Sequence, residues 1–390
     1  MGWWWWKPDL NLSITRRDLP PYSPTSHFSL SYQMPRIAVI PGDGIGVEVM
    51  KEARRVLAAL DDTETLDLEL VDWDLGAERY LRDGVAITEE EFRALADDHD
   101  AVFLGALGDP RVPGMEHIKA ILLGLRFKLD LYVNFRPCVL PLARLSPLTG
   151  IQKPFRIDTF RENTEGLYTG LGGSFKTGTP DEIVIEKDLH TRKGVERIIR
   201  AAFEYAELKG RGRVTLVDKA NVQRFVGGLW RKVFEEVGEA YPRISQDSMY
   251  VDAMAMDLVR RPDQYEVLVT SNLFGDIISD LAAEVTGGLG LAPSANIHPG
   301  QYALFEPVHG SAPDIAGQGL ANPIGAIRCV SLMLEYFGYE HLGDRIEEGV
   351  LASIENGITT PDLVGGKSST EEVGRWIASY VESASAQTFS

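Results

Sequence analysis

The sequence contains little cysteine, no long apolar run and fewer basic than acidic side chains. Its 390 residues include only two cysteines, Cys138 and Cys329, and neither lies in a CxxC or histidine-containing spacing. This supports neither a disulfide framework nor a thiolate metal site, and it fits a reducing cytoplasm. No apolar run approaches the roughly 20 residues needed to span a bilayer. The 39 basic and 57 acidic side chains give a formal charge of −18, which opposes binding to nucleic acid or an anionic membrane.

The chain has enough apolar residues for a sizeable core. At 390 residues and 44% hydrophobic composition, it is expected to form two domains. Residues 1–33 contain four consecutive tryptophans and a Pro/Ser-rich middle without the pattern of a signal peptide. We therefore interpret residues 1–33 as a disordered extension or a mis-assigned start.

From Arg36 onward, short β-branched runs alternate with longer segments of helical spacing. Examples are "RIAVI" and "AVFLGAL", with helical patterns between them. This rhythm predicts an α/β protein with a parallel sheet. The Gly- and Thr-rich stretch at about 166–185 lacks helical periodicity, which predicts a hairpin-like arm able to pair across a dimer.

A glycine-rich turn, "IPGDGIG" at Ile40–Gly46, follows the first predicted strand. Such turns often hold phosphates at helix starts. However, its spacing is G-x-G-x-G and no lysine follows as in a P-loop, so the motif by itself is a weak nucleotide signal.

A pair of aspartates gives the sharpest indication of chemistry. Asp276 and Asp280, in "NLFGDIISD", are four residues apart and would share one helical face. Neighbouring carboxylates repel each other unless a cation lies between them, and oxygen ligands favour Mg²⁺ or Mn²⁺. The alternative is a solvated helix face. Asp252 in "YVDAMAMDLV" is a third carboxylate among apolar residues, where an unpaired charge is costly.

Three further features suggest a binding cleft. The arginines Arg126, Arg136 and Arg161 could bind a small dianion bidentately, or be unrelated surface residues. Lys219 follows a predicted strand and either points into a cleft or is an ordinary solvated lysine. The long loop from Phe305 to Pro323 is rich in Gly, Pro, Ser and Asp, and loops of that length are often functional.

Together these stretches resemble the isocitrate/isopropylmalate dehydrogenase family of metal-dependent β-decarboxylating dehydrogenases. The resemblance runs from about Pro35 to Ile377 and is most specific at "NLFGDIISDLAAEVTGGLGLAPSANI" and "FEPVHGSAPDIAGQGLANP". It implies a two-domain fold with a mostly parallel sheet, distinct from a Rossmann dinucleotide fold. Residues 34–131 plus 287–390 would form the first, cofactor-binding domain, and residues 132–286 the second, dimerising domain.

The resemblance also implies roles for individual residues. Asp276 and Asp280 of one subunit and Asp252 of the other would hold Mg²⁺ or Mn²⁺, in a homodimer with shared active sites. Lys219 would assist deprotonation of the substrate hydroxyl, and Tyr168 would protonate the enol. The implied substrate-binding residues are Leu122, Leu123, Arg126, Arg136, Arg161, Asn221, Val222 and Asp252.

The implied cofactor is NAD. Asp314 would accept hydrogen bonds from the ribose diol and repel a 2′-phosphate, whereas NADP-using relatives have a Lys-Tyr pair where this sequence has Asp314-Ile315. The glycine turn would form one wall of the cleft, with Ile45 against the cofactor. The implied cofactor-binding residues are Ile45, Glu306, His309, Gly310, Ser311, Ala312, Pro313, Asp314, Ile315 and Asn322.

The favoured substrate is 3-isopropylmalate, as in leucine biosynthesis, because Leu122, Leu123 and Val222 suit an alkyl group and would leave a further carboxylate unpaired. Two features instead resemble the tartrate/D-malate branch of the family, "RENTEG" and the arm, and Lys119 stands where many isopropylmalate enzymes have a glutamate. D-malate or tartrate is thus the alternative substrate. A non-catalytic regulatory subunit is a remote alternative, because none of the implied catalytic residues is lost.

Overall fold

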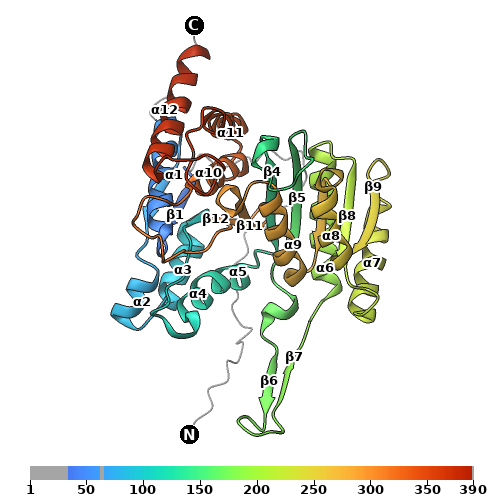
Figure 1. Ribbon diagram of the computed structural model, residues 1–390. Coiled ribbons are helices and arrows are strands. Elements are labelled where there is room, and N and C mark those ends of the chain that lie inside the picture. The colour runs from blue at the N-terminus through green and yellow to red at the C-terminus, as the bar shows by residue number, and fades with distance from the viewer. Residues whose placement is uncertain (1–33, 62–65, 389–390) are drawn as a thin grey trace.

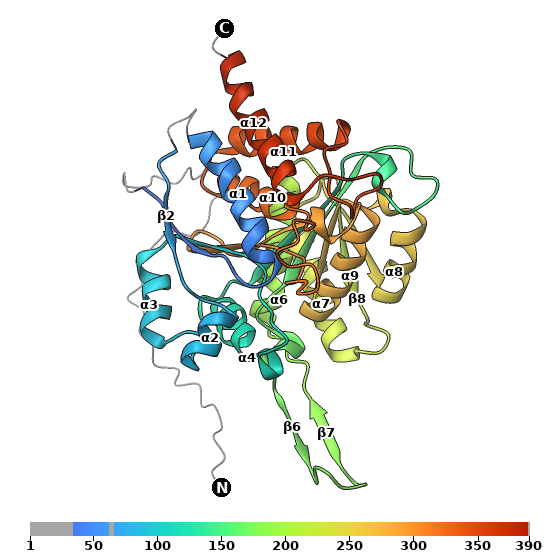
Figure 2. The ribbon, with the colours of Figure 1, turned by 60° about the vertical axis from the view of Figure 1, so that its left-hand side comes forward.

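The structure is a computed structural model that describes residues 34–61 and 66–388, so the predicted extension at residues 1–33 lies outside the described residues. One large sheet carries helices on both faces, and a two-stranded hairpin projects from one end (Figures 1 and 2). The expectation of an α/β fold with a mostly parallel sheet is confirmed. In the described part of the chain, no helix combines the length and apolar character needed to cross a membrane.

The elements of the amino-terminal half begin at Arg36. They are β1 (Arg36–Ile40), α1 (Ile45–Asp61), β2 (Glu69–Asp72), α2 (Ala77–Asp83), α3 (Glu89–Asp98), β3 (Ala101–Leu104), α4 (Glu116–Ile118), the π-helical segment η2 (Lys119–Leu123), α5 (Gly124–Lys128), β4 (Val133–Leu140), β5 (Phe155–Glu162), the 3₁₀ turn η4 (Gly166–Thr169), β6 (Gly172–Phe175) and β7 (Ile183–Glu186).

The second half alternates helices and strands and ends in three helices. Its elements are α6 (Arg192–Leu208), β8 (Arg213–Asp218), α7 (Arg224–Gly238), β9 (Ser245–Tyr250), α8 (Val251–Arg260), β10 (Val267–Thr270), α9 (Asn272–Val285), β11 (Pro293–His298), β12 (Tyr302–Pro307), α10 (Ile324–Tyr336), α11 (Glu340–Glu355) and α12 (Thr370–Thr388).

The strand order of the large sheet is β2-β1-β3-β12-β11-β4-β5-β10-β8-β9. The strands from β2 to β12 in this order are parallel to one another, as are those from β5 to β9. The antiparallel pairings of β11 and β4 join these two sets. The central strands therefore reverse the sheet direction, and the chain crosses between the two sets at β4–β5 and again at β11–β12. The division into domains at residues 131/132 and 286/287 stays a prediction.

Strands buried on both faces explain the continuous apolar runs of the sequence. In β1, Ile37 and Val39 pack with α1 and α10 in one cluster, while Ala38 and Ile40 pack with Leu95 of α3 on the other face. In the second set, β10 alternates likewise between a cluster with α6 and α7 and a cluster with α8 and α9. Parallel strands covered by helices on both sides lose the polar alternation of a half-exposed strand.

The segments that carry the predicted functional residues lie at the carboxyl ends of parallel strands. At the ends of β1, β3 and β12 lie the glycine turn, residues 105–109 and the loop at residues 308–323. At the ends of β5, β8, β9 and β10 lie the segments that carry Arg161, Lys219, Asp252 and Asp276. Ligand sites of open α/β sheets form at such ends because the connecting loops converge there.

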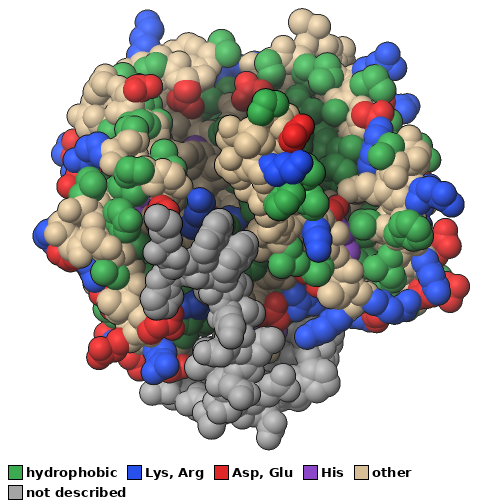
Figure 3. Space-filling view, turned by 90° about the horizontal axis from the view of Figure 1, so that it is seen from below, with side chains coloured by type: hydrophobic (Ala, Val, Ile, Leu, Met, Phe, Trp, Pro, Cys, Tyr) green, Lys and Arg blue, Asp and Glu red, His purple; other side chains and the backbone are tan. Residues whose placement is uncertain are grey.

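The predicted arm is confirmed as a hairpin of β6 and β7, paired antiparallel from Gly172–Glu186 to Phe175–Ile183. It projects away from the rest of the molecule (Figure 2). Its large apolar side chains are exposed, Phe175 by 64% and Val184 by 67%, and hydrophobic atoms are visible on it from below (Figure 3). A two-stranded hairpin is marginally stable alone in water, so this arm is suited to packing against another chain.

Asp43 fastens the glycine turn to three other segments. Its Oδ1 accepts from the backbone N–H of Ala77 at 2.7 Å, and its Oδ2 accepts from the N–H of Gly108 at 2.8 Å and lies 3.0 Å from His117 Nε2. The carboxylate and the imidazole are both buried. Gly44 is needed here because its φ is +54° and a Cβ would lie 2.1 Å from the Ser311 carbonyl oxygen.

We expect Asp43→Ala to lower the free energy of unfolding by about 3 kcal/mol, because two buried N–H groups and a buried imidazole would lose their acceptor. Urea denaturation followed by far-ultraviolet circular dichroism at fixed protein concentration measures this change. The control is Asp74→Ala, which removes an exposed carboxylate paired with Arg82 and should cost less than about 0.5 kcal/mol. Equal losses in the two variants would contradict the prediction.

Candidate active site

The two aspartates predicted to share a helical face do so on α9. Arg136 of β4 contacts both: its Nη2 lies 3.3 Å from Asp276 Oδ1 and its Nη1 lies 3.0 Å from Asp280 Oδ1. Burial raises the pKa of Asp280, and the neighbouring Asp276 adds to this against the effect of Arg136. The guanidinium of Arg136 therefore lies beside both carboxylates, and their role as metal ligands stays a prediction.

Arg161, at the end of β5, is the most buried of the three arginines, with 1% of its surface exposed. It forms an ion pair with Asp276, and Asn272 Oδ1 accepts from its Nε at 2.9 Å and its Nη2 at 2.7 Å. Burial lowers the pKa of Arg161 to about 10, and the charge of Arg136 acts in the same direction. The burial of Asp276 opposes its ionisation, but Arg161 and Arg136 outweigh this effect and lower its pKa.

Tyr168 joins the same group from the turn η4. Its hydroxyl donates to Asp276 Oδ2 at 2.8 Å, and the Arg161 guanidinium lies over its ring at 5.1 Å. Burial raises the pKa of the phenol, so Tyr168 is protonated at neutral pH and is available as a proton donor. The structure thus brings Tyr168, Arg136, Arg161 and the two aspartates into one charged group.

Arg126 of α5 is held by Glu306 at the end of β12, with Nη2 2.7 Å from Oε1. Both side chains are buried, and Asn296 Nδ2 also donates to Glu306 Oε1, at 2.8 Å. Glu306 was expected among the cofactor-binding residues, yet its contacts are with Arg126, an expected substrate-binding residue. The charge of Arg126 also contributes to lowering the pKa of Asp276, so Arg126 belongs to the same electrostatic group.

Leu122 and Leu123 lie on the π-helical segment η2 directly before α5. Both are partly buried, whereas Lys119, which begins this segment, is exposed. A π-helical turn is rare and frequently occurs at functional sites, because it changes the direction of the side chains along the helix. Here it lies between the buried His117 and Arg126, and it carries the two leucines.

Lys219 and Asp252 form a second, separate group. Lys219, after β8, makes an ion pair with Asp252 in the first turn of α8, and hydrogen bonding to Lys219 lowers the pKa of Asp252. Asn221 and Val222 follow Lys219 and are exposed, Val222 by 69%. Among residues 34–61 and 66–388, no three acidic, histidine or cysteine side chains gather closely enough to hold a metal ion. Within one chain, Asp252 therefore does not complete a three-carboxylate site with Asp276 and Asp280.

The loop expected to bind the cofactor begins at residue 308, because Phe305–Pro307 belongs to β12. The glycine turn contacts it directly, since the N–H of Ile45 donates to the Ser311 carbonyl at 2.8 Å. The Ile45 side chain itself is buried in the core cluster around α1. On the other side, the N–H of Gly319 donates to Glu48 Oε2 at 3.2 Å. The loop is thus fixed against the start of α1.

The residues of this loop differ in exposure. Ser311 and Asn322 are buried, His309, Ala312 and Ile315 are partly buried, and Gly310, Pro313 and Asp314 are exposed. His309 Nδ1 lies 3.0 Å from the Gly310 carbonyl oxygen, so this nitrogen carries the proton. Its Nε2 is a buried acceptor without a hydrogen-bond partner in the described structure, and burial lowers the pKa of this imidazole.

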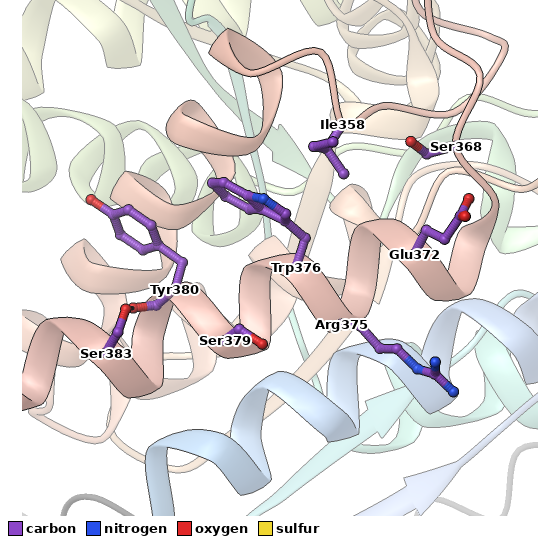
Figure 4. A pocket seen from close by; sticks show the side chains of 8 residues that line it. All are labelled: Ile358, Ser368, Glu372, Arg375, Trp376, Ser379, Tyr380 and Ser383. Atoms are coloured by element: carbon purple, nitrogen blue, oxygen red, sulfur yellow. Dashed lines mark hydrogen bonds between the residues drawn. The ribbon is translucent and has the colours of Figure 1, made fainter.

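A hollow of about 600 Å³ lies elsewhere, along the outer side of α12 (Figure 4). Trp376 and Tyr380 stack on one another at its wall, with ring centroids 5.7 Å apart. None of its lining residues belongs to the groups described above. The charged groups at the strand ends, rather than this hollow, therefore define the candidate active site.

Sequence reasoning did not identify several residues that organise these groups. Asn272 binds Arg161, which is more than 100 residues away, and Asn296 binds Glu306, which is about 10 residues away. Neither asparagine gave a separate signal in the sequence, because its role depends on that partner. Asp43 was visible only as part of the glycine turn. A search for polar residues within apolar strand and helix segments would have singled out Asn296, which lies in β11.

Buried arginines beside paired carboxylates are typical of one class of protein, enzymes that act on small acids. The comparisons agree with this class. The family model described as isocitrate/isopropylmalate dehydrogenase matches residues 36–377. A 3-isopropylmalate dehydrogenase of Corynebacterium jeikeium is 49% identical over 87% of this chain and 97% of its own length. One of Thermobifida fusca is 45% identical over 90% of this chain and 99% of its own length.

Among solved structures, isocitrate dehydrogenase from Methylococcus capsulatus superposes with a TM-score of 0.81 at 38% identity, covering 90% of this chain and all of that one. The chain belongs to the isocitrate/isopropylmalate dehydrogenase family. It is thus an oxidatively decarboxylating dehydrogenase that acts on a small hydroxy acid.

Proposed function

We propose that the protein oxidises 3-isopropylmalate to 4-methyl-2-oxopentanoate and CO₂ with NAD, the oxidative decarboxylation of leucine biosynthesis. The observation that carries this proposal is the identity of 45–49% to relatives named 3-isopropylmalate dehydrogenase over 82–90% of the chain. Two partly buried leucines three and four residues before Arg126 support an alkyl-substituted substrate, because a further carboxylate of the substrate would lie unpaired against them.

The buried arginines would bind the two carboxylates of the substrate. Arg126 is paired with Glu306 through Nη2, and Arg136 with Asp280 through Nη1 and with Asp276 through Nη2. Nε of each arginine is buried without a hydrogen-bond partner in the described structure. Guanidinium groups of this kind keep donors free for a carboxylate. Arg161 is held more tightly by Asn272 and Asp276, which would fix its direction before the substrate arrives.

Two side chains of the protein would move the protons. Lys219 would accept the proton of the substrate hydroxyl during oxidation, and Tyr168 would protonate the enolate carbon after CO₂ has left. Asp276 and Asp280, with Asp252 of the partner subunit, form an oxygen-only ligand set that fits Mg²⁺ or Mn²⁺. When bound, this ion supplies Lewis acidity toward the substrate oxygens, and NAD supplies the hydride acceptor.

The loop at residues 308–323 fits the adenosine half of NAD. His309 Nε2 is a free, buried acceptor suited to an N–H or O–H donor of adenosine. The exposed Asp314 carboxylate suits the ribose diol and opposes a 2′-phosphate. The backbone of the loop is held in place on its own side, since Gln318 Nε2 donates to the Asp314 carbonyl at 2.7 Å.

The proposed active site is shared in a homodimer. Lys219 and Asp252 pair with each other, apart from Asp276 and Asp280, and so lack the partners that the reaction requires within one chain. Exposed apolar residues lie on α8 and α9, with Met256 57% and Ile277 54% exposed, and the hairpin arm is apolar as well. Packing of these surfaces between two subunits would bury them and bring Lys219 and Asp252 to the other subunit's aspartates.

The function is tested by comparing kcat/KM on 3-isopropylmalate, D-malate, tartrate and isocitrate, each with NAD and with NADP. We expect at least about tenfold preference for 3-isopropylmalate and for NAD, because apolar pocket residues and Asp314 reject the alternatives. The measurement is the initial rate of cofactor reduction at 340 nm with Mg²⁺ or Mn²⁺. A tenfold preference for D-malate would favour the tartrate/D-malate alternative, and no reduction with any acid would favour a regulatory subunit.

The metal site is tested by Asp276→Asn, which keeps the side-chain shape and removes its charge. We expect a loss of at least about 100-fold in kcat and weaker Mn²⁺ binding, observed directly by electron paramagnetic resonance of the ion. Asp247→Asn, an exposed aspartate of β9, is the control and should change neither quantity. Unaltered Mn²⁺ binding by Asp276→Asn would refute the metal assignment.

The shared site is tested with mixed dimers of Asp276→Asn and Lys219→Ala subunits, co-expressed with different tags. One site of each mixed dimer would combine both changes, and the other would have an intact aspartate and an intact lysine. We therefore expect about half of the wild-type kcat from two nearly inactive parents. Mixed dimers as inactive as the parents would show that Lys219 serves the site of its own chain.

A further inference from the structure

A partly buried polar cluster lies between the segments that carry Lys219 and Tyr168. We call it the His190 cluster: Asp188, His190, Gln223 and Trp230. His190 Nε2 lies 2.8 Å from Asp188 Oδ1, Trp230 Nε1 donates to His190 Nδ1 at 3.2 Å, and Gln223 Nε2 donates to Asp188 Oδ2 at 2.8 Å. The side chain of His190 is only 2% exposed. None of these residues contacts the arginines or aspartates described above.

The directions of these hydrogen bonds fix the protonation of His190. An indole N–H can only donate, so the Nδ1 that it contacts must be the unprotonated nitrogen of a neutral imidazole. The proton is then on Nε2 and is donated to Asp188. One oxygen of Asp188 is occupied by His190 and the other by Gln223, so the carboxylate bridges the imidazole and the amide.

The cluster reaches Lys219 through Gln223. This residue directly precedes α7, at the position where a side chain commonly caps the helix, but its side chain makes no cap and bonds Asp188 instead. The Lys219 carbonyl accepts from the N–H groups of Val222 and Gln223 at 2.9 and 2.8 Å. Lys219–Gln223 is therefore a closed turn whose last residue is tied to Asp188.

The same segment also supports the turn of Tyr168. The N–H of Gly166, which begins η4, donates to the Leu189 carbonyl at 2.8 Å. The neighbouring Glu165 carboxylate accepts from the N–H and hydroxyl of Thr191 at 2.8 and 2.5 Å. Residues 188–191 thus hold the Tyr168 turn by the backbone and the Lys219 turn by the Asp188 carboxylate.

We propose that His190 is a positioning residue for Lys219. By fixing Asp188, it holds the Lys219 turn in a constant position relative to the Tyr168 turn. This inference rests on the proposed function of Lys219. Gln223 and Trp230 also line a small cavity together with Val217 and Phe274. The backbone carbonyl of Gln223 accepts from the N–H of Gly227 at 2.7 Å, and its side chain donates to Asp188. The side-chain bond is the one that depends on His190, and it positions Gln223 and, through it, Lys219.

Two substitutions separate the two hydrogen bonds of His190. His190→Gln places an amide N–H near the position of Nε2 and retains the bond to Asp188, whereas His190→Asn places its polar atoms near Nδ1 and retains only the acceptor for Trp230. We expect His190→Asn to lower kcat about tenfold with KM within about twofold, because Lys219 moves the proton and the arginines bind the substrate. His190→Gln should keep kcat within about threefold of wild type.

The chain offers a matched control in a second buried pair, in which Trp73 Nε1 donates to His99 Nε2 at 3.3 Å and His99 Nδ1 lies 3.0 Å from the Ala94 carbonyl. His99→Asn should lower the Tm by an amount similar to His190→Asn and leave kcat unchanged. This comparison separates the loss of a buried histidine from the displacement of Lys219.

Hydrogen–deuterium exchange gives a readout that does not depend on turnover. The amides of residues 219–224 should exchange faster in His190→Asn than in wild type, and at the wild-type rate in His190→Gln and His99→Asn. The proposal would be overturned if the two His190 variants lost kcat equally and exchanged equally. It would also be overturned if His190→Asn kept the kcat and the exchange rates of the wild type. A wild-type protein inactive on all four acids would refute the proposed function, while exchange would still decide whether His190 holds the turn.

Discussion

Three buried guanidinium groups require negative partners, and this requirement organises the candidate active site. Arg126, Arg136 and Arg161 are each at least 90% buried, where an unpaired charge would cost several kcal/mol. Glu306 neutralises the first, and Asp276 and Asp280 neutralise the others. The carboxylates that would bind the metal thus also keep the arginines charged inside the protein, and in the proposed function substrate and metal binding would depend on the same set of charges.

The sheet explains how these charges meet. Its two parallel sets run in opposite directions and are joined by antiparallel β11 and β4. Glu306 lies at the end of β12 in one set, Arg161 at the end of β5 in the other, and Arg136 on β4 between them, so residues from both sets surround one cluster. Asn296 on β11 connects Glu306 with Asn134 and Asn163 by hydrogen bonds of 2.8–2.9 Å. Because a side-chain amide can donate and accept at once, Asn296 satisfies the hydrogen-bonding groups of these buried neighbours, which an apolar side chain would leave without partners.

The separation of Lys219 and Asp252 from the arginine group has a functional meaning in the proposed dimer. Each chain would contribute its arginines, tyrosine and paired aspartates to one site and its lysine and third aspartate to the other. The His190 cluster then lies between two turns that serve different active sites. Residues 188–191 join these two turns through the Asp188 carboxylate and the backbone.

The sequence by itself determined the local features. Alternating apolar runs predicted the α/β sheet, the Gly- and Thr-rich stretch predicted the hairpin, and the four-residue spacing of Asp276 and Asp280 placed both on one face of α9, since helical and strand periodicities are properties of short segments. The glycine turn contacts the later loop through Ile45 and Ser311, while its place as one wall of the cleft stays a prediction.

Only the tertiary structure decided which distant residues meet. Glu306 pairs with Arg126 across 180 positions, Asp43 with His117 across 74, and Trp230 with His190 across 40. The protonation of His190, the π-helical turn before Arg126 and the separation of Asp252 from Asp276 also follow from the fold alone. Hydrogen bonds and ion pairs between elements depend on strand order and helix packing, which no periodicity within a single segment encodes.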